Sequence, residues 1–188
     1  MDYPYHTEKT ESERVPVAEF LDRFVDVAKF LRFCESCENY NVGWGCPPYD
    51  FDPLDLWRRY SEVKAVGVRI VFDESVVGAK LDHEAWTELY DTVMRREKGK
   101  LYRELKEEER AGEGRFMLHA GGGCPVCEKP CRREEGPCRH PEEVRYSIES
   151  LGGDVCAVTE ELLGYGICWI EDGKIPAYLS LVGGMLCR

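Results

Sequence analysis

The sequence lacks any apolar run of the roughly 20 residues that a membrane-spanning helix requires, and its mean hydropathy is −0.44. Residues 1–14 contain neither a basic segment nor an apolar segment of the kind that directs secretion. We therefore expect a soluble protein in the reducing cytoplasm, with no membrane partner.

Basic residues are also scarce, with 25 Lys and Arg against 36 Asp and Glu and a formal charge of −11. This excess of negative charge disfavours binding to phosphate backbones, so we expect no nucleic-acid partner. The glycine run 121–123 has no Lys-Ser/Thr after it and no G-x-G-x-x-G spacing, which excludes the common phosphate-binding loops.

Cysteine, in contrast, is plentiful, with ten in 188 residues. This is below the roughly 8–10% of small disulfide scaffolds, and disulfides are rare in a reducing compartment. Seven of the ten fall into two tight groups. Reduced cysteines at such spacings indicate a bound metal or cluster.

The second group has the spacing Cys124-x2-Cys127-x3-Cys131-x6-Cys138. Four thiolates are what a fully ligated 4Fe-4S cluster needs, although this spacing differs from the C-x2-C-x2-C-x3-C-P run of bacterial ferredoxins. Cys131 and Cys138 are too far apart to form the second knuckle of an ordinary zinc site. Iron–sulfur is therefore favoured here, with zinc as the alternative.

The first group, Cys34-x2-Cys37-x8-Cys46-Pro47-Pro48, has only three local cysteines. Three thiolates on a 4Fe-4S cluster would leave one iron open to a substrate or to a fourth protein ligand. The spacing is not the C-x3-C-x2-C of radical S-adenosylmethionine enzymes. Five residues are candidates for the fourth ligand: Cys156, Cys168, Cys187, His119 and His140.

Other residues near the two groups have two interpretations each. The aromatic residues Tyr40, Trp44 and Tyr49 would shield a cluster or simply pack the loop. The basic residues Arg132, Arg133, Arg139 and His140 would compensate cluster charge or simply be exposed. The glycines 121–123 would allow close backbone approach, with amide N–H groups directed at sulfur.

Apolar periodicity and turn residues predict an α+β (or α/β) fold: a small mixed sheet with flanking helices and two cysteine-rich cluster-binding loops. We expect a flexible N-terminal segment at 1–14 and a single metal-binding domain at 15–188. Helices are predicted at 15–33, 54–60, 82–111, 141–151 and 159–163. Strands are predicted at 63–72, 115–120, 166–170 and 175–182, the last two joined as a hairpin through Asp172-Gly173.

Two sets of motifs resemble those of the prokaryotic family catalogued as domain of unknown function 2284, predicted metal-binding proteins. The first is C-x2-C-x-x-Y followed by W-x-C-P-P-Y, from Cys34 to Tyr49. The second is GGC-x2-C-x3-C, then P-C-R-x-P-E and S-x-E-x-x-G-x-D-V, between Gly122 and Val155. The resemblance implies a small metal-binding protein of bacteria or archaea whose ligands are the seven grouped cysteines. It implies no reaction.

Three functions follow as hypotheses. The first is an electron-transfer protein that carries one or two 4Fe-4S clusters and serves a redox partner protein. The second is an iron–sulfur enzyme whose three-cysteine cluster keeps an open iron for a small-molecule substrate. The third is a structural zinc protein. The sequence identifies no catalytic residue and leaves both enzymatic activity and oligomeric state open.

Overall fold

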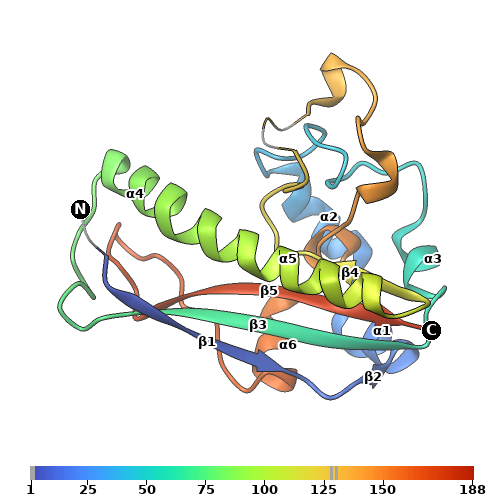
Figure 1. Cartoon of the computed structure of the whole chain (residues 1–188), viewed down its shortest axis with the longest axis horizontal. Coiled ribbons are helices and arrows are strands. Elements are labelled where there is room, and N and C mark those ends of the chain that lie inside the picture. The colour runs from blue at the N-terminus through green and yellow to red at the C-terminus, as the bar shows by residue number, and fades with distance from the viewer. Residues whose placement is uncertain (1–2, 128, 130) are drawn as a thin grey trace.

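A computed structural model describes residues 3–127, 129 and 131–188. At its centre is an antiparallel sheet with the strand order β1-β3-β5-β4, to which β2 adds by pairing with β3 (Figure 1). The strands are β1 Tyr5–Glu11, β2 Val15–Pro16, β3 Glu62–Phe72, β4 Arg115–Leu118 and β5 Tyr178–Cys187. The α+β class is confirmed, and the named strands pair antiparallel where a mixed sheet was expected.

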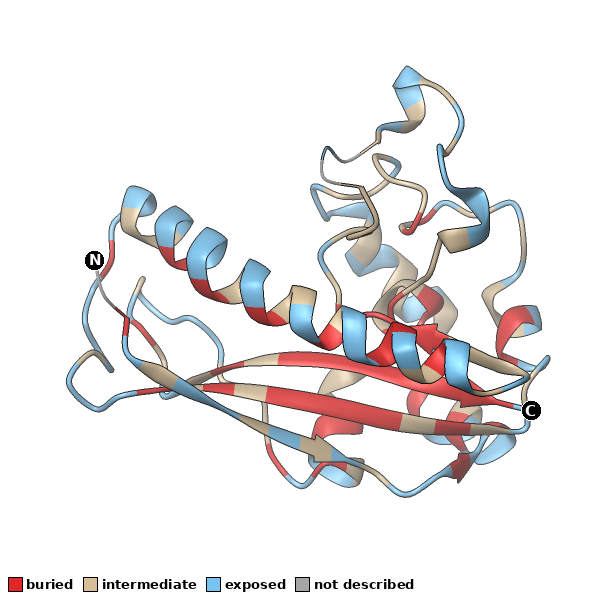
Figure 2. Cartoon of the chain, in the orientation of Figure 1, coloured by how far each residue is buried: buried red, intermediate tan, exposed pale blue. Residues whose placement is uncertain are grey.

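The two longest strands, β3 and β5, form the middle of the sheet. Both are predominantly apolar and bury most of their residues, and they pair in register from Glu62↔Cys187 to Val71↔Tyr178. Figure 2 shows the buried residues concentrated on these strands and on the adjoining side of the long helix over residues 83–111. A strand with both faces covered reads as a nearly continuous apolar run, which is why 63–72 was predictable.

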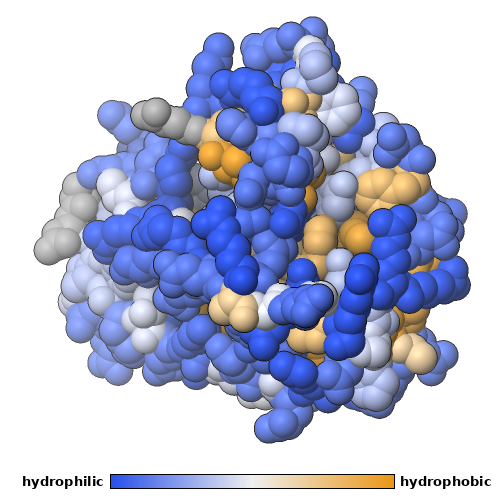
Figure 3. Space-filling view, turned by 45° about the vertical axis from the view of Figure 1, so that its right-hand side comes forward, coloured by the Kyte–Doolittle hydropathy of each residue, from blue (hydrophilic) through white to orange (hydrophobic). Residues whose placement is uncertain are grey.

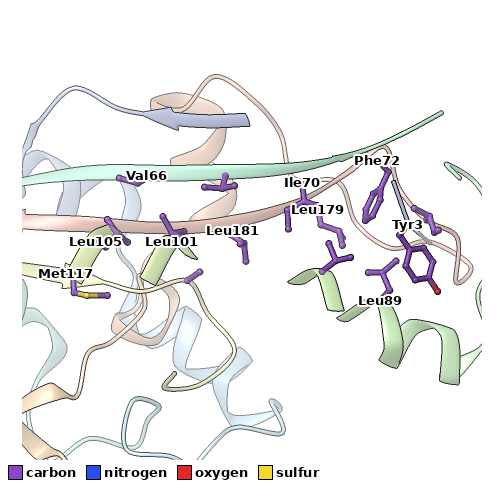
Figure 4. Packing of buried hydrophobic residues seen from close by; sticks show 14 of the residues in the cluster. Tyr3, Val66, Ile70, Phe72, Leu89, Leu101, Leu105, Met117, Leu179 and Leu181 are labelled. Atoms are coloured by element: carbon purple, nitrogen blue, oxygen red, sulfur yellow. The ribbon is translucent and has the colours of Figure 1, made fainter. Parts of the chain in front are cut away.

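One face of the sheet is covered by a long helix that runs through α4 His83–Leu89, η1 Tyr90–Met94 and α5 Arg95–Ala111. Its start is fixed by Asp82, whose carboxylate accepts a 2.9 Å hydrogen bond from the Ala85 amide. The predicted helix at 82–111 is thus confirmed. Figure 4 shows Leu101 and Leu105 packed between this helix and the strands.

The opposite face carries a second apolar cluster built on α1 Val17–Phe24, α3 Pro53–Trp57 and α6 Val155–Leu162. Trp57 is fully buried there, and its indole N–H donates to the carbonyl oxygen of Leu151 at 3.1 Å. The result is a sheet between two helical layers. None of the helices in the described ranges has the length and apolar character that crossing a bilayer requires.

The N-terminal segment differs from its prediction. Residues 5–11 form strand β1, which pairs with β3 from Tyr5↔Phe72 to Glu11↔Val66, so the expectation of a flexible segment is wrong for these residues. The strand has mostly polar residues and lies at the sheet edge, where backbone pairing needs no apolar alternation. Residues 1 and 2 lie outside the described ranges.

The predicted helix at 15–33 is in fact two helices, α1 and α2 Val27–Glu35. Between them Val25 is extended and forms a bridge with Gly153. The Asp26 carboxylate then starts α2 by accepting a 2.9 Å hydrogen bond from the Lys29 amide. A contact distant in sequence therefore interrupts an amphipathic pattern that is locally continuous.

Two further predictions are wrong for the same reason. Residues 141–151 form only the short 3₁₀ turns η3 Pro141–Glu143 and η4 Glu149–Leu151, because Tyr146 between them bridges Leu118 of β4. Residues 166–170 are not a strand, although the turn at Asp172 and Gly173 forms with positive φ values of 54° and 69°. β5 pairs with β3 and β4 instead.

Candidate metal centre

Both cysteine loops lie on the same side of the sheet. Figure 1 shows the loop after α2 (blue to cyan) beside the loop after β4 (yellow to orange), above the sheet. The first cysteine, Cys34, lies in the last turn of α2. Elements far apart in sequence thus carry the two groups to one place.

The first loop is a series of tight turns. The Cys37 amide donates to the Cys34 carbonyl at 3.0 Å, and the Cys46 amide donates to the Gly43 carbonyl at 3.4 Å. Tyr49 donates through its hydroxyl to the Gly45 carbonyl at 3.0 Å and makes an edge contact with Tyr146. Tyr49 therefore packs the loop, which was one of its two interpretations.

The four cysteines of the second group surround one cavity of about 110 Å³. Its wall also includes Cys46, Trp44, Val126, Val144 and His140. The His140 amide donates to Cys138 Sγ at 3.4 Å, and the Val126 amide bonds to the Cys124 sulfur. Amide hydrogen bonds of this kind stabilise thiolates, as at many metal–sulfur sites.

The three cysteines of the first group line an adjoining cavity of about 210 Å³. Polar residues share its wall: Asn39, Tyr40, Ser147, Glu149 and Ser150. The Asn39 amide donates to Cys37 Sγ at 3.5 Å, repeating the pattern of an amide two residues after a cysteine. Cys46 lines both cavities, so the two groups adjoin.

The donor chemistry fits a soft or borderline metal, because seven thiols are gathered around two small cavities. All ten cysteines are free thiols. Within the described ranges, however, no three His, Cys, Asp or Glu side chains are close enough together to hold a metal ion. The thiols therefore line the two cavities without converging on one point, and binding a metal would require their side chains to move together.

Burial affects the ionisation of these thiols. It raises the pKa of Cys46 to about 11, and the neighbouring Cys37 and Cys34 add to the effect. Burial also raises the pKa of Cys124. Since thiolates are the metal-binding form, a cation bound here would displace the thiol protons.

Lys98 is a component of the site that the sequence analysis missed. From α5 its ammonium group donates to the carbonyl oxygens of Gly121, Gly122 and Gly123 at 2.5, 3.0 and 3.3 Å. Gly122 and Gly123 have positive φ values of 85° and 84°, which glycine adopts at little cost. The hydrogen bonds described for this loop thus join its carbonyls to a lysine, where amide contacts to sulfur were expected.

Of the basic residues near the second group, Arg133 has the clearest structural role. Its guanidinium donates to the carbonyl oxygens of Gly43 at 3.1 Å and Cys46 at 2.7 Å, and it lies 4.9 Å from the Trp44 ring centroid. It therefore fastens the first loop to the second. Arg132 instead pairs with Glu134 at the surface.

None of the five residues proposed from the sequence as a fourth ligand lines the three-cysteine cavity. His119 directs Nδ1 at the Ala120 carbonyl, 2.6 Å away, and Nε2 at the Arg145 carbonyl, 3.0 Å away. Burial lowers the pKa of His119 to about 4. His140 lines the four-cysteine cavity. The other three candidates line neither cavity: Cys156, Cys168 and Cys187.

Glu149 is a second residue that the sequence analysis missed. It belongs to η4 and lines the three-cysteine cavity. Its Oε2 is enclosed and has no hydrogen-bond partner, and burial raises the pKa of the carboxyl. The only signal in the sequence is its place within the motif S-x-E-x-x-G-x-D-V, which indicates the family and no particular chemistry for the carboxylate.

Comparison with curated proteins and with solved structures gave no match. One family model matches residues 23–186 of the 188-residue chain, and it is described as a predicted metal-binding protein of domain of unknown function 2284. The matched range contains all seven grouped cysteines, together with Lys98 and Glu149. The chain therefore belongs to the metal-binding family of domain of unknown function 2284.

Proposed function

We propose that the protein binds two 4Fe-4S clusters, one in the four-cysteine cavity and one in the three-cysteine cavity. The two clusters would exchange single electrons with each other and with a partner protein. The observation that carries this proposal is the arrangement of seven thiols around two cavities that share Cys46. Membership of a metal-binding family supports it.

The four-cysteine cavity has the ligand count of a closed cluster site. Its wall contains apolar side chains from both loops, Val126 and Val144 from one and Trp44 from the other. A cluster enclosed in this way has little access to substrate, and the low polarity around it affects its potential. These features favour reversible electron transfer over catalysis at this site.

The adjacency of the cavities supports electron movement between them. Cys46, Asn39 and Gly122 contribute to both walls, so clusters held there would be separated by single residues. Figure 3 shows a mostly hydrophilic face with hydrophobic side chains in small, separate areas. With a net charge of −11, the chain favours a redox partner that offers a basic surface.

A second candidate function is an iron–sulfur enzyme, and the size of the three-cysteine cavity favours it. At about 210 Å³ this cavity exceeds the other, at about 110 Å³, and its wall carries the polar side chains of Tyr40, Ser150 and Glu149. A small molecule bound at an open iron would meet these groups. Cyanide, which binds an open iron, would then change the visible spectrum.

The experiment that tests the proposal is electron paramagnetic resonance of protein purified and reduced under anaerobic conditions. We expect two interacting reduced clusters in the wild type. Cys124→Ser is expected to remove one signal and Cys37→Ser the other, with Cys187→Ser as a matched control on β5 that retains both. A wild type that contains zinc and gives no cluster signal would overturn the proposal.

A further inference from the structure

We infer that Glu149 is the fourth protein ligand of the metal centre formed by Cys34, Cys37 and Cys46. This inference rests on the proposed function for the nature of the metal centre. It goes further in assigning a ligand that is not a cysteine, and in closing the position that three cysteines alone would leave open.

The first support is the state of the Glu149 carboxylate. Its Oε2 is buried without a hydrogen-bond partner in the described part of the chain. A buried carboxylate oxygen without a partner is costly, and native proteins pair nearly all such groups with a donor, a water or an ion. A metal ion in the neighbouring cavity would supply the missing partner.

The second support is position. Glu149 lines the same cavity as the three cysteines. Its Oε1 lies 2.8 Å from the point that a Cβ on Gly121 would occupy. Any larger residue at 121 would displace the carboxylate, so the glycine leaves room for it beside the cysteines.

The third support is the way that the chain holds Glu149. The two serines on either side exchange hydrogen bonds, with the Ser147 amide donating to Ser150 Oγ at 3.0 Å and the Ser150 amide donating to Ser147 Oγ at 3.2 Å. After them Gly152 closes the turn at a φ of 87°. A ligand on so well-fixed a turn loses little freedom when it binds.

The assignment of Glu149 is strengthened because the other candidate ligands do not reach this cavity. The nitrogens of His119 face backbone carbonyls, and His140 lines the other cavity. The cavity wall contains one carboxylate beside its three cysteines, within the described residues, and that carboxylate is Glu149. A carboxylate is a harder ligand than a thiolate, so the iron that it binds would be the one most easily lost.

The test compares Glu149→Gln, Glu149→Cys and a control, Glu38→Gln. Gln keeps the shape of Glu149 but removes its anionic oxygen, and Cys supplies a thiolate. Glu38 is an exposed carboxylate next to Cys37, so its substitution removes the same charge from the same loop without touching the cavity wall. Circular dichroism of each variant verifies folding.

After mild oxidation, Glu149→Gln is expected to lose one iron per chain and to give the resonance of a 3Fe-4S cluster. Glu149→Cys and Glu38→Gln are expected to retain the wild-type iron content. Iron content and resonance in Glu149→Gln identical to those of the wild type would overturn the inference. If Glu149→Gln misfolds, the decision rests on Glu149→Cys. Loss of one iron per chain from folded Glu149→Cys would also overturn the inference.

Failure of the proposed function is distinguishable from failure of this inference. If the wild type holds zinc and no sulfide, the cluster proposal fails, and zinc retention by the same variants then tests the ligand. Zinc lost by Glu149→Gln and kept by Glu149→Cys would support Glu149 as a ligand. Zinc content unchanged in Glu149→Gln would overturn that assignment as well.

Discussion

The Arg133 guanidinium donates a 2.7 Å hydrogen bond to the carbonyl oxygen of Cys46. A residue between two cysteines of the second group thereby holds Cys46 of the first group, which lines both cavities. The two cysteine groups are therefore one structural unit.

Arg133→Gln is expected to speed the loss of metal to a chelator by about tenfold. It removes two hydrogen bonds from a charged donor, and the loss of about 1.5 kcal/mol, the low end for one such bond, corresponds to about tenfold. Arg132→Gln is the matched control, because Arg132 is exposed and pairs with Glu134 at the surface, 3.2 Å away. Equal release rates from both variants would contradict the fastening role of Arg133.

Lys98→Met is expected to lower the reduction potential of a bound cluster. Reduction adds negative charge, and a nearby half-buried cation stabilises the reduced form by about 1 kcal/mol, on the order of 50 mV for one electron. Lys100→Met is the control, since Lys100 is an exposed residue of the same helix that pairs with Glu97. Potentiometric titration measures both, and an unchanged potential in Lys98→Met would count against the role of its charge.

Glu109→Gln is expected to reduce the free energy of unfolding by about 3–5 kcal/mol. The Glu109 carboxylate accepts from Arg145 at 2.6 Å and Lys106 at 2.7 Å, and also from the Met117 amide at 2.9 Å. Burial alone would raise its pKa, but these hydrogen bonds lower the pKa overall. Substitution would leave Arg145 without a counter-charge at that position.

Urea denaturation measures this loss, and Glu107→Gln provides its control. Glu107 is exposed on the same helix, so its substitution is expected to change stability by less than about 0.5 kcal/mol. A similarly small change in Glu109→Gln would show that the buried pair contributes little.

His119 is expected to make stability fall as the pH is lowered below about 6.5. Its pKa is about 4 in the folded protein, against an ordinary value near 6.5, so below pH 6.5 the unfolded chain binds a proton that the folded chain does not. The expected loss is about 2 kcal/mol between pH 6.5 and 5. His119→Gln should flatten this dependence, whereas an unchanged profile would contradict the low pKa.

Local patterns predicted those parts of the fold whose structure is decided locally. The helix that begins after Asp82 was predictable from a capping residue and charge pattern, and β3 from its apolar run. Pairing between distant segments was not predictable. It turns the polar segment 5–11 into a strand, breaks the helix at Val25, and pairs β5 with β3 and not with 166–170.

In the candidate site, too, local sequence predicted some features and contacts between distant segments determined the others. Thiol spacing identified the seven cysteines, whose convergence on adjoining cavities is a property of the fold. Lys98 and Glu149 were missed because each reaches the site from an element distant in sequence from the cysteines that it approaches. Their residue types are common on solvated surfaces, so only their burial and contacts distinguish them.

The most direct test of the two-cluster account is metal and acid-labile sulfide analysis of the wild-type protein purified without oxygen. The account predicts about eight iron and about eight sulfide per chain, falling by about half in Cys124→Ser. Zinc without sulfide, or iron without sulfide, would contradict it.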